Sequence, residues 1–395
     1  MLKRGILHLR SIATTNQVRW RTKVALQDAE NSERMHAWQI HSYGGPEELQ
    51  LASARMPVIT RPNDLLVKVE AASVNPIDIA MSRGYGATLF NVMRKLRNFT
   101  NGTKNDLEFP LTLGRDFAGS VVSKGHDIDD NIQIGDEVWG IVPLESQGCH
   151  AKYVVVDKSM IRPRPPNLSH IEAASILYCG LTAWSALWIT GDIGKIMEMP
   201  GKKSILVLGG SGGVGTLAIQ LLKTWNQRVV TTCNTDAVTM LDQLGAHAVI
   251  DYKSEDADQR VVAEGPYAII LDCANQGVDN IKLKGYPFDT FISLNSPILK
   301  NFDEYGLFGG YLRTIMKIYS NAGEAVCGKG WVKWAFFIPS QDGFDTLQTL
   351  EFTETLKMLQ ITPVIDKVFK FEDLPKAYEQ LDQGHARGKI VIDMK

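Results

Sequence analysis

The chain has 395 residues, a formal net charge of −2 and 44% hydrophobic residues. This composition is ordinary for a globular protein, and the near-neutral charge argues against a nucleic-acid-binding surface. The length suits two domains, and the sequence has no run of the roughly 20 apolar residues that a membrane-spanning helix requires.

The first 30 residues differ in character from the rest of the chain. No acidic residue precedes Asp28, and the apolar residues Leu2, Ile6, Leu9 and Ala13 can line one face of a helix. The basic residues in this segment are Lys3, Arg4, Arg10, Arg19, Arg21 and Lys23. A basic, acid-free, amphipathic start is typical of a mitochondrial transit peptide. We therefore expect residues 1–30 to be such a peptide and the protein to lie in the mitochondrial matrix, with a disordered basic tail as the alternative.

Residues 35–169 predict a small all-β unit. The segment 65–74 alternates apolar and polar residues, as a half-buried strand does, and further short strands are expected within 114–125, 135–142 and 151–161. Turn residues recur about every ten positions, which suits a barrel-like arrangement. Between these strands, residues 84–110 are polar with few strand signals, so we expect a long loop there.

From Ile171 onward the pattern changes to alternating helices and strands. A helix is expected over 171–189, and a last helix at 349–359 precedes a terminal strand, helix and strand. Strands are expected at 203–208, 228–233, 247–252, 267–273, 290–294 and 333–338, with helices at 213–225 and 236–244. This alternation predicts an α/β fold with a doubly wound parallel sheet.

A glycine-rich turn lies between the first of these strands and its helix. Its residues are Gly210, Ser211, Gly212, Gly213, Val214 and Gly215. In the dinucleotide-binding fingerprint, the first glycine permits a tight turn, the second lets a pyrophosphate approach, and the third lets the helix pack on the strand. The context therefore favours a dinucleotide site, although a purely structural turn has the same glycines.

The next strand bears on which nicotinamide cofactor is used. Its tip consists of Cys233, Asn234 and Thr235, and Asp236 is expected to cap the following helix. An acidic residue at this tip binds the ribose hydroxyls in NAD-dependent proteins. A neutral tip, with Asn234 as a cofactor contact, favours NADPH over NADH.

The five cysteines are scattered along the chain and form no C-x-x-C pair. A disulfide framework is therefore not expected, and a reducing compartment fits better.

Seven segments together resemble the medium-chain dehydrogenase/reductase superfamily, in its zinc-free quinone oxidoreductase branch. They are residues 72–86, 109–121, 135–140, 180–187, 208–220, 244–256 and 384–392. With the basic start and the long segment after Gly84, the chain looks most similar to the mitochondrial reticulon-interacting (Nogo-interacting) subgroup. The resemblance implies a GroES-like β-barrel catalytic domain of residues 35–170 and 346–395, with a Rossmann domain of residues 171–345 inserted, and a homodimer as a frequent assembly.

The resemblance also allows a check for zinc. Asn75 stands where zinc-dependent relatives have a first cysteine, and Arg115 and Asp116 replace their histidine and glutamate. A tetrahedral zinc site needs nitrogen and sulfur ligands that these positions do not supply. No metal is therefore expected.

The same resemblance implies contacts along a bound cofactor. Ser211, Gly213 and Val214 would lie near the pyrophosphate, and Tyr252 and Lys253 near the extra phosphate of NADPH. Asn275, Leu294, Phe336 and Phe337 would lie toward the ribose and nicotinamide, and His385, Ala386 and Arg387 would close over the cofactor. The structural alternatives are a solvated Lys253, core packing of the two phenylalanines and a surface salt bridge of Arg387.

A hydride acceptor such as a quinone gains negative charge on oxygen, which a hydrogen-bond donor stabilises. The candidates are Asn75 and Tyr85, with a turn residue and a packing residue as their structural alternatives, whereas Asp78 is expected to make structural hydrogen bonds. The function expected is that of a zinc-independent NADPH-dependent oxidoreductase that reduces a quinone or enone in coenzyme Q metabolism. One alternative is a 2-enoyl thioester reductase, with a basic mouth of Arg94, Lys95, Arg97 and Lys104. The other is a non-catalytic NADPH-binding protein with reticulon-like partners.

Overall fold

The fold is described from a computed structural model. It describes residues 34–100, 108–129, 131–198, 203–326, 328, 330–352, 361–384 and 386–395. The expected transit peptide, Lys104 and His385 lie outside the described residues.

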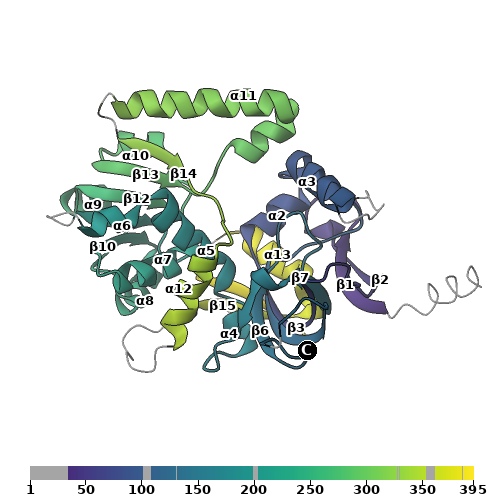
Figure 1. The fold of residues 1–395 in the computed structure, drawn as a ribbon. Coiled ribbons are helices and arrows are strands. Elements are labelled where there is room, and N and C mark those ends of the chain that lie inside the picture. Colours follow the sequence, from purple (N-terminus) through teal and green to yellow (C-terminus); the bar gives the residue numbers. More distant parts are fainter. Residues whose placement is uncertain are drawn as a thin grey trace, which may run out of the picture.

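Strands from both ends of the chain share one sheet (Figure 1). Its strand order is β15-β16-β3-β5-β6-β8, and β7 also pairs with β3. The bounds are β3 (Asp64–Val74), β5 (Asp116–Lys124), β6 (Glu137–Ile141), β7 (Tyr153–Asp157), β8 (Ile161–Pro163), β15 (Ile365–Lys370) and β16 (Lys389–Asp393). A small sheet of β2 (Gln50–Arg55), β1 (Arg34–Ile40) and β4 (Leu111–Thr112) lies beside it. Strand β3 pairs with β16, β5 and β7. It is buried on both faces rather than half-buried as expected, and only Lys68 in it is exposed.

The second large sheet is parallel, with strand order β11-β10-β9-β12-β13-β14. Its strands are β9 (Ser204–Leu208), β10 (Val229–Cys233), β11 (Ala248–Asp251), β12 (Tyr267–Asp272), β13 (Phe288–Ser293) and β14 (Trp331–Trp334). In β9, Ile205 and Val207 belong to one apolar core, while Leu206 and Leu208 belong to another. Because both faces of this sheet are covered, the strand is one continuous apolar run. The predicted doubly wound sheet is confirmed.

Helices cover the faces of this parallel sheet, and others pack beside the sheet that contains β3 and β16 (Figure 1). They are α2 (Pro76–Ser82), α3 (Ala87–Thr100), α4 (His170–Ala173), α5 (Leu177–Trp184), α6 (Ile193–Glu198), α7 (Gly213–Thr224), α8 (Val238–Leu244), α9 (Ala257–Ala263), α10 (Val278–Leu283), α11 (Ile298–Val326), α12 (Gln341–Phe352) and α13 (Leu374–Asp382). The helix expected at 171–189 is α4 and α5 followed by a π-helical segment over 185–190.

The long loop expected at 84–110 is wrong for residues 87–100, which form α3. The Asp303 carboxylate in α11 accepts hydrogen bonds from the Gly86 and Thr88 amides at 2.6 and 3.0 Å. Phe90 in α3 is buried in the core. The groups that stabilise the start of this helix therefore lie more than two hundred residues away in sequence.

Three further elements differ from the sequence prediction. The edge strand β14 covers 331–334 rather than 333–338, and α12 begins at Gln341 rather than near 349. Residues 353–359 of the expected helix lie outside the described part of the chain. The long helix α11 was not predicted; it is two helical segments joined at Gly306, where φ is 66°.

Within the described residues, the helical stretch His170–Thr190 is long and apolar enough by composition to cross a bilayer. In this protein, 72% of its most apolar window is buried inside the fold, as in the core helix of a globular protein.

Candidate active site

The glycine turn between β9 and α7 has three tight positions. Gly209 has φ of +74°, so the positive φ that the tight turn needs falls on Gly209 and not on Gly210 as expected. A Cβ on Gly210 would lie 2.0 Å from the Thr231 hydroxyl oxygen, and a Cβ on Gly215 would lie 2.4 Å from the Gly209 carbonyl oxygen. Gly210 and Gly215 are therefore required by packing between the strand, the turn and the helix.

Gly212 differs from these positions because it faces open space. A Cβ there would meet no atom closer than the Gly209 carbonyl oxygen at 3.7 Å. Gly212 is also the N-cap of α7, whose first amide groups, from Gly213 and Val214 on, have no intrahelical acceptor. These amides and the positive end of the helix dipole suit an anion. The turn thus has the open cradle that a dinucleotide pyrophosphate needs.

The C-terminal segment crosses this turn just before β16. The Gly388 amide donates to the Ser211 carbonyl oxygen at 2.8 Å, and Gly388 forms a parallel bridge with Gly212. The next residue back, Arg387, makes an ion pair with Asp236, and both side chains are about half exposed. The predicted Ala386 and Arg387 therefore lie beside the glycine turn, and the free protein has the surface salt bridge given as the alternative for Arg387.

Asp236 was expected to cap the next helix, and this expectation is wrong, because its carboxylate pairs with Arg387 instead. Asn234 caps the short 3-10 turn of residues 235–237, where its side-chain oxygen accepts from the Thr235 amide at 2.9 Å.

The tips of β10 and β11 bring together the residues expected at the adenosine end. The Tyr252 amide donates to the Cys233 carbonyl oxygen at 3.0 Å, and half of the Tyr252 side chain is exposed. Between them, the Asp251 carboxylate accepts from the Thr235 hydroxyl and the Lys253 amide. These hydrogen bonds hold the pKa of Asp251 below its ordinary value. Sequence reasoning missed Asp251, because it examined acidic residues after β10 and not after β11.

Residues expected at the nicotinamide end gather after β12, β13 and β14. The Asn295 side-chain amide donates to the Asn275 side-chain oxygen at 3.1 Å, and Asn275 has φ of +54°. Leu294 is half-buried against the core. Phe337 stacks on Tyr178 with ring centroids 4.2 Å apart, whereas Phe336 is exposed. Core packing, the alternative for this pair, therefore describes Phe337 and not Phe336.

The two candidate donors have different surroundings. Asn75 is fully buried, and its NH₂ group donates to the Asp116 carboxylate at 2.9 Å. Among the described residues, the one hydrogen bond of the Tyr85 hydroxyl is a long 3.3 Å contact with the Ser296 carbonyl oxygen. Burial, followed by the charge of Asp303, raises the pKa of Tyr85, so its hydroxyl stays protonated through the physiological range.

A buried lysine joins Asn75, and sequence reasoning did not single it out. The Lys389 ammonium donates to the Asn75 side-chain oxygen at 2.5 Å and lies 3.8 Å from an Asp116 carboxylate oxygen. Its side chain also runs beside the glycine turn, since a Cβ on Gly213 would lie 3.1 Å from its Cδ. The only sequence signal was a lysine at the start of an otherwise apolar strand, a pattern that more often indicates an exposed residue.

The positions compared with zinc ligands hold a second buried network. Asp78 accepts from the Asn75 and Gly114 amides, both at 2.9 Å, which confirms the structural hydrogen bonds expected of it. The buried Arg115 guanidinium lies 3.6 Å from the same carboxylate. Among the described residues, no group of three or more histidine, cysteine and acidic side chains is placed to hold a metal ion. The local donor set therefore does not fit tetrahedral zinc.

The described cysteines, Cys149, Cys179, Cys233 and Cys273, are free thiols. Cys179 lies beside the glycine turn, with its sulfur 3.8 Å from the Asn75 side-chain oxygen. Burial raises its pKa, so it is a neutral thiol at physiological pH and not an activated nucleophile.

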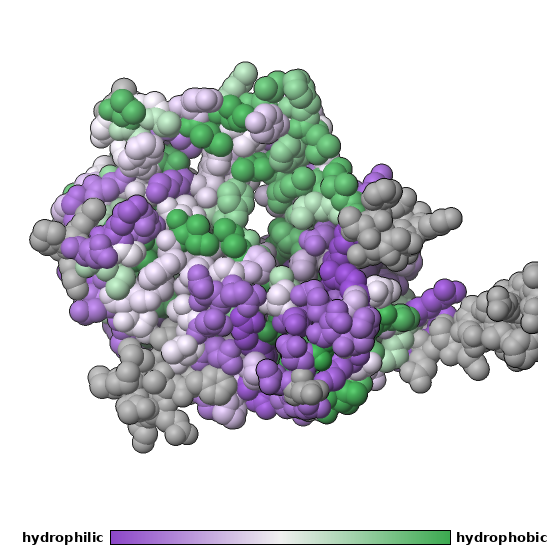
Figure 2. All heavy atoms as spheres, viewed as in Figure 1, coloured by the Kyte–Doolittle hydropathy of each residue, from purple (hydrophilic) through white to green (hydrophobic). Residues whose placement is uncertain are grey.

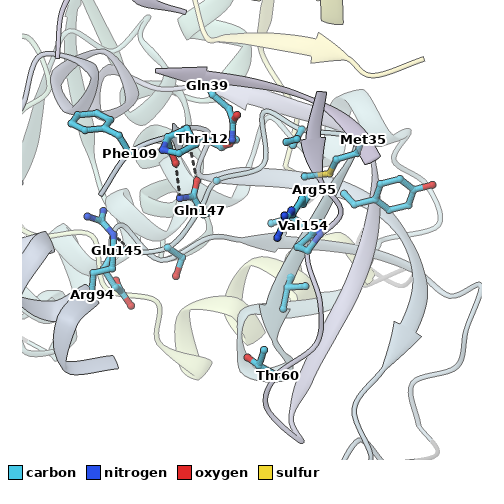
Figure 3. Close-up of a pocket in the computed structure, with 18 of the residues that line it drawn as sticks. Met35, Gln39, Arg55, Thr60, Arg94, Phe109, Thr112, Glu145, Gln147 and Val154 are labelled. Atoms are coloured by element: carbon cyan, nitrogen blue, oxygen red, sulfur yellow. Dashed lines mark hydrogen bonds between the residues drawn. The ribbon is translucent and has the colours of Figure 1, made fainter. Parts of the chain in front are cut away.

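A cavity of about 630 Å³ lies away from the glycine turn, beside β1 and β2 (Figure 3). Arg94 and Arg97, two of the residues considered for a basic cleft mouth, line it. The Arg94 guanidinium donates to the Glu145 carbonyl oxygen at 3.1 Å, and Arg97 lies 3.7 Å from the Glu145 carboxylate. These two cations are engaged within the protein and do not gather at the glycine turn.

Comparison with known proteins agrees with this geometry. Residues 61–166 match the family described as alcohol dehydrogenase GroES-like domain, and residues 244–392 match that described as zinc-binding dehydrogenase. The NAD(P)H oxidoreductase RTN4IP1, mitochondrial, of Drosophila melanogaster is 41% identical over 93% of this chain and 88% of its own. The human protein of the same name is 38% identical over 98% of both chains. The quinone oxidoreductase structure from Coxiella burnetii has a TM-score of 0.70 and 28% identity, covering 92% of this chain and all of that one.

The two RTN4IP1 relatives are named as mitochondrial, which confirms the predicted mitochondrial location. The two matched domains, the doubly wound sheet and the glycine turn agree with the resemblance seen in the sequence. The chain belongs to the medium-chain dehydrogenase/reductase family of oxidoreductases, in the group of the mitochondrial RTN4IP1 proteins.

Proposed function

We propose that this protein is an NADPH-dependent oxidoreductase that transfers hydride to a quinone or an enone in the mitochondrial matrix, where it supports coenzyme Q metabolism. The observation that carries the proposal is the open position at Gly212, next to free helix-terminal amides and bridged by Gly388. The names of the relatives, NAD(P)H oxidoreductase and quinone oxidoreductase, support the same class of reaction.

In this proposal the chain binds and orients its two substrates. The amides of Gly213 and Val214 hold the pyrophosphate, and Tyr252 and Lys253 contact the additional phosphate. Asn275, Leu294 and Phe336 lie along the ribose and nicotinamide, and residues 386–388 cover the turn. A bound nicotinamide supplies the hydride. The two substrate sites fall between the parallel sheet and the sheet that contains β3 and β16.

Tyr85 and Asn75 are the proposed donors to the acceptor oxygen. Tyr85 is the better placed, because its hydroxyl is held only by the 3.3 Å contact with Ser296. The Asn75 amide is engaged with Asp116 and Lys389, so we propose that it contributes a fixed dipole.

Replacing Tyr85 with phenylalanine should lower kcat about tenfold or more with little change in the Kd for NADPH. The physical reason is the loss of a donor that stabilises negative charge only as it develops. Because the pKa of Tyr85 is raised, the parent rate should not fall with deprotonation until the pH exceeds the ordinary tyrosine value of about 10. Steady-state rates with a short-chain quinone across pH test this. An unchanged kcat in Tyr85→Phe would remove Tyr85 from the reaction.

Lys253 should determine part of the preference for NADPH. Replacing it with alanine should weaken NADPH binding about tenfold, roughly 1.4 kcal/mol, and leave NADH binding unchanged. Titration calorimetry with both cofactors measures this directly. The control is Lys195→Ala, which removes an exposed lysine that pairs with Asp192. Equal weakening of NADPH and NADH, or none, would contradict a phosphate contact.

The function itself is tested by NADPH oxidation with a ubiquinone analogue, an ortho-quinone and a 2-enoyl thioester, with NADH in parallel. Turnover on quinones with NADPH preferred is the expected result. Turnover confined to the thioester would instead identify a 2-enoyl thioester reductase. Tight NADPH binding without turnover on any acceptor would favour a binding protein with reticulon-like partners.

A further inference from the structure

Helix α11 presents an inverted distribution of polar and apolar residues. The side that faces the protein carries the buried polar residues Asn301, Thr314 and Asn321. Asn301 donates to the Thr314 hydroxyl at 3.1 Å, and Asn321 donates to the Val332 carbonyl oxygen at 3.5 Å. A surface helix of a globular protein normally buries its apolar stripe and exposes its polar one. The buried positions in the second half of α11 are Gly310, Thr314 and Asn321, so most large apolar residues of this half are on the outside.

We call the exposed apolar residues of the second half of α11 its outer face. Phe308, Tyr319 and Met316 in it are 77%, 74% and 69% exposed. The face consists of Leu307, Phe308, Tyr311, Leu312, Met316, Ile318 and Tyr319, with Val326 at the end of the helix. Figure 2 shows hydrophobic residues along the edge of the molecule where Figure 1 places α11, most densely toward the right end and interspersed with paler residues. Contiguous apolar patches of this kind mark interaction surfaces more often than isolated exposed side chains do.

The patch continues onto a second element that packs against α11. Helix α3 contacts α11, and its side chains Met93 and Leu96 are 41% and 62% exposed. Asp303 of α11 holds the start of α3 through the Gly86 and Thr88 amides. The two helices therefore form one fixed surface.

The charges that border this surface are mainly positive. Lys300, Arg313 and Lys317 line one depression together with one carboxylate, Glu304, which lies 3.7 Å from the Lys300 ammonium. Between positions 305 and 323 the sequence contains Arg313 and Lys317 and no acidic residue. These two cations are four residues apart, so they lie on one side of the helix, at the border of the outer face. Both are exposed, and the Arg313 guanidinium stacks on the Tyr305 ring at 4.6 Å. An apolar face rich in phenylalanine and tyrosine, bordered by Arg and Lys, is the composition of a helix that lies in a membrane interface.

We propose that the outer face of α11 docks the protein on the surface of an anionic lipid bilayer. Phenylalanine, leucine and methionine side chains enter the boundary between headgroups and acyl chains, the tyrosine hydroxyls remain at headgroup level, and Arg313 and Lys317 contact lipid phosphates. A symmetric contact between two copies fits less well, since it would bring Arg313 and Lys317 of both copies together with one carboxylate per copy, Glu304, which is already paired with Lys300. The proposal does not depend on the identity of the hydride acceptor.

The test is flotation of the full chain with vesicles of phosphatidylcholine alone and of phosphatidylcholine with phosphatidylglycerol. The parent chain should bind the anionic vesicles and bind neutral ones more weakly. Phe308→Ser combined with Tyr319→Ser should lower binding to both about tenfold or more. Arg313→Gln combined with Lys317→Gln should lower binding to anionic vesicles several-fold and leave neutral vesicles unaffected.

The matched control is Val58→Ser combined with Ile134→Ser, which removes two apolar residues that are 76% and 65% exposed elsewhere on the surface. It should bind vesicles as the parent does, and thermal unfolding and NADPH binding should be the same in all these variants. Absence of vesicle binding by the parent, or equal binding by Phe308→Ser/Tyr319→Ser, would overturn the proposal. A parent dimer that the same double substitution dissociates, without vesicle binding, would assign the face to a second copy of the chain and would also overturn it.

Discussion

A valine in place of Gly212 should abolish dinucleotide binding while leaving the protein folded. Its backbone, with φ of −79° and ψ of 172°, is extended and open to any residue, and a Cβ there meets nothing closer than 3.7 Å. The branched side chain would instead fill the space through which a pyrophosphate approaches the α7 amides. We expect the Kd for NADPH to rise at least about 100-fold, or roughly 2.7 kcal/mol. Fluorescence titration of NADPH measures the loss, and thermal unfolding measures the fold.

The neighbouring glycine provides the contrast. In Gly210→Ala the new Cβ would lie 2.0 Å from the Thr231 hydroxyl oxygen, which itself donates to the Val207 carbonyl oxygen at 2.8 Å. This clash within packed structure should destabilise the protein by about 1–3 kcal/mol. Gly212→Val should therefore lose cofactor binding but keep the stability of the parent, whereas Gly210→Ala should be less stable than the parent. A folded Gly212→Val variant with parental affinity for NADPH and NADH would refute the assignment of the glycine turn.

Removing the charge of Lys389 should damage both stability and turnover. In Lys389→Met the Asp116 carboxylate would remain fully buried without its cation, and the Asn75 side-chain oxygen would lose its 2.5 Å donor. Breaking a buried ion pair on one side costs about 3–5 kcal/mol. We also expect kcat to fall about tenfold or more, because Asn75 would lose its fixed orientation. Urea unfolding gives the first quantity and steady-state kinetics the second.

Two further variants make this result specific to the network. Combining Lys389→Met with Asp116→Asn removes the uncompensated charge, so part of the stability should return. Lys203→Met removes a lysine from an exposed pair with Asp289 and should change stability by less than about 1 kcal/mol. If Lys389→Met unfolds with the same free energy as Lys203→Met, the buried pair of Lys389 and Asp116 does not stabilise the fold.

The sequence determined the features that depend on neighbouring residues. The continuous apolar run of β9 predicts a strand, because a strand of a parallel sheet is buried on both faces. The 3.6-residue spacing of apolar residues in α7 predicts a helix, and both patterns are local. The glycine fingerprint was readable for the same reason: its function resides in consecutive backbone positions. Even there, the positive φ falls on Gly209, one residue before the pattern.

Contacts between distant parts of the chain were decided only by the tertiary structure. Lys389 meets Asn75 across 314 residues of sequence, and the start of α3 is held by Asp303 of α11. Neither partner carries a local signal, since a lysine before an apolar strand or an aspartate in a helix has many uses. In α11, Asn301 and Thr314 bond to each other across the kink and Asn321 bonds to Val332, so polar residues take the buried positions and most large apolar ones face outward. Hydrophobicity alone assigns them to the core; only the packing of the whole chain shows that they are on the surface.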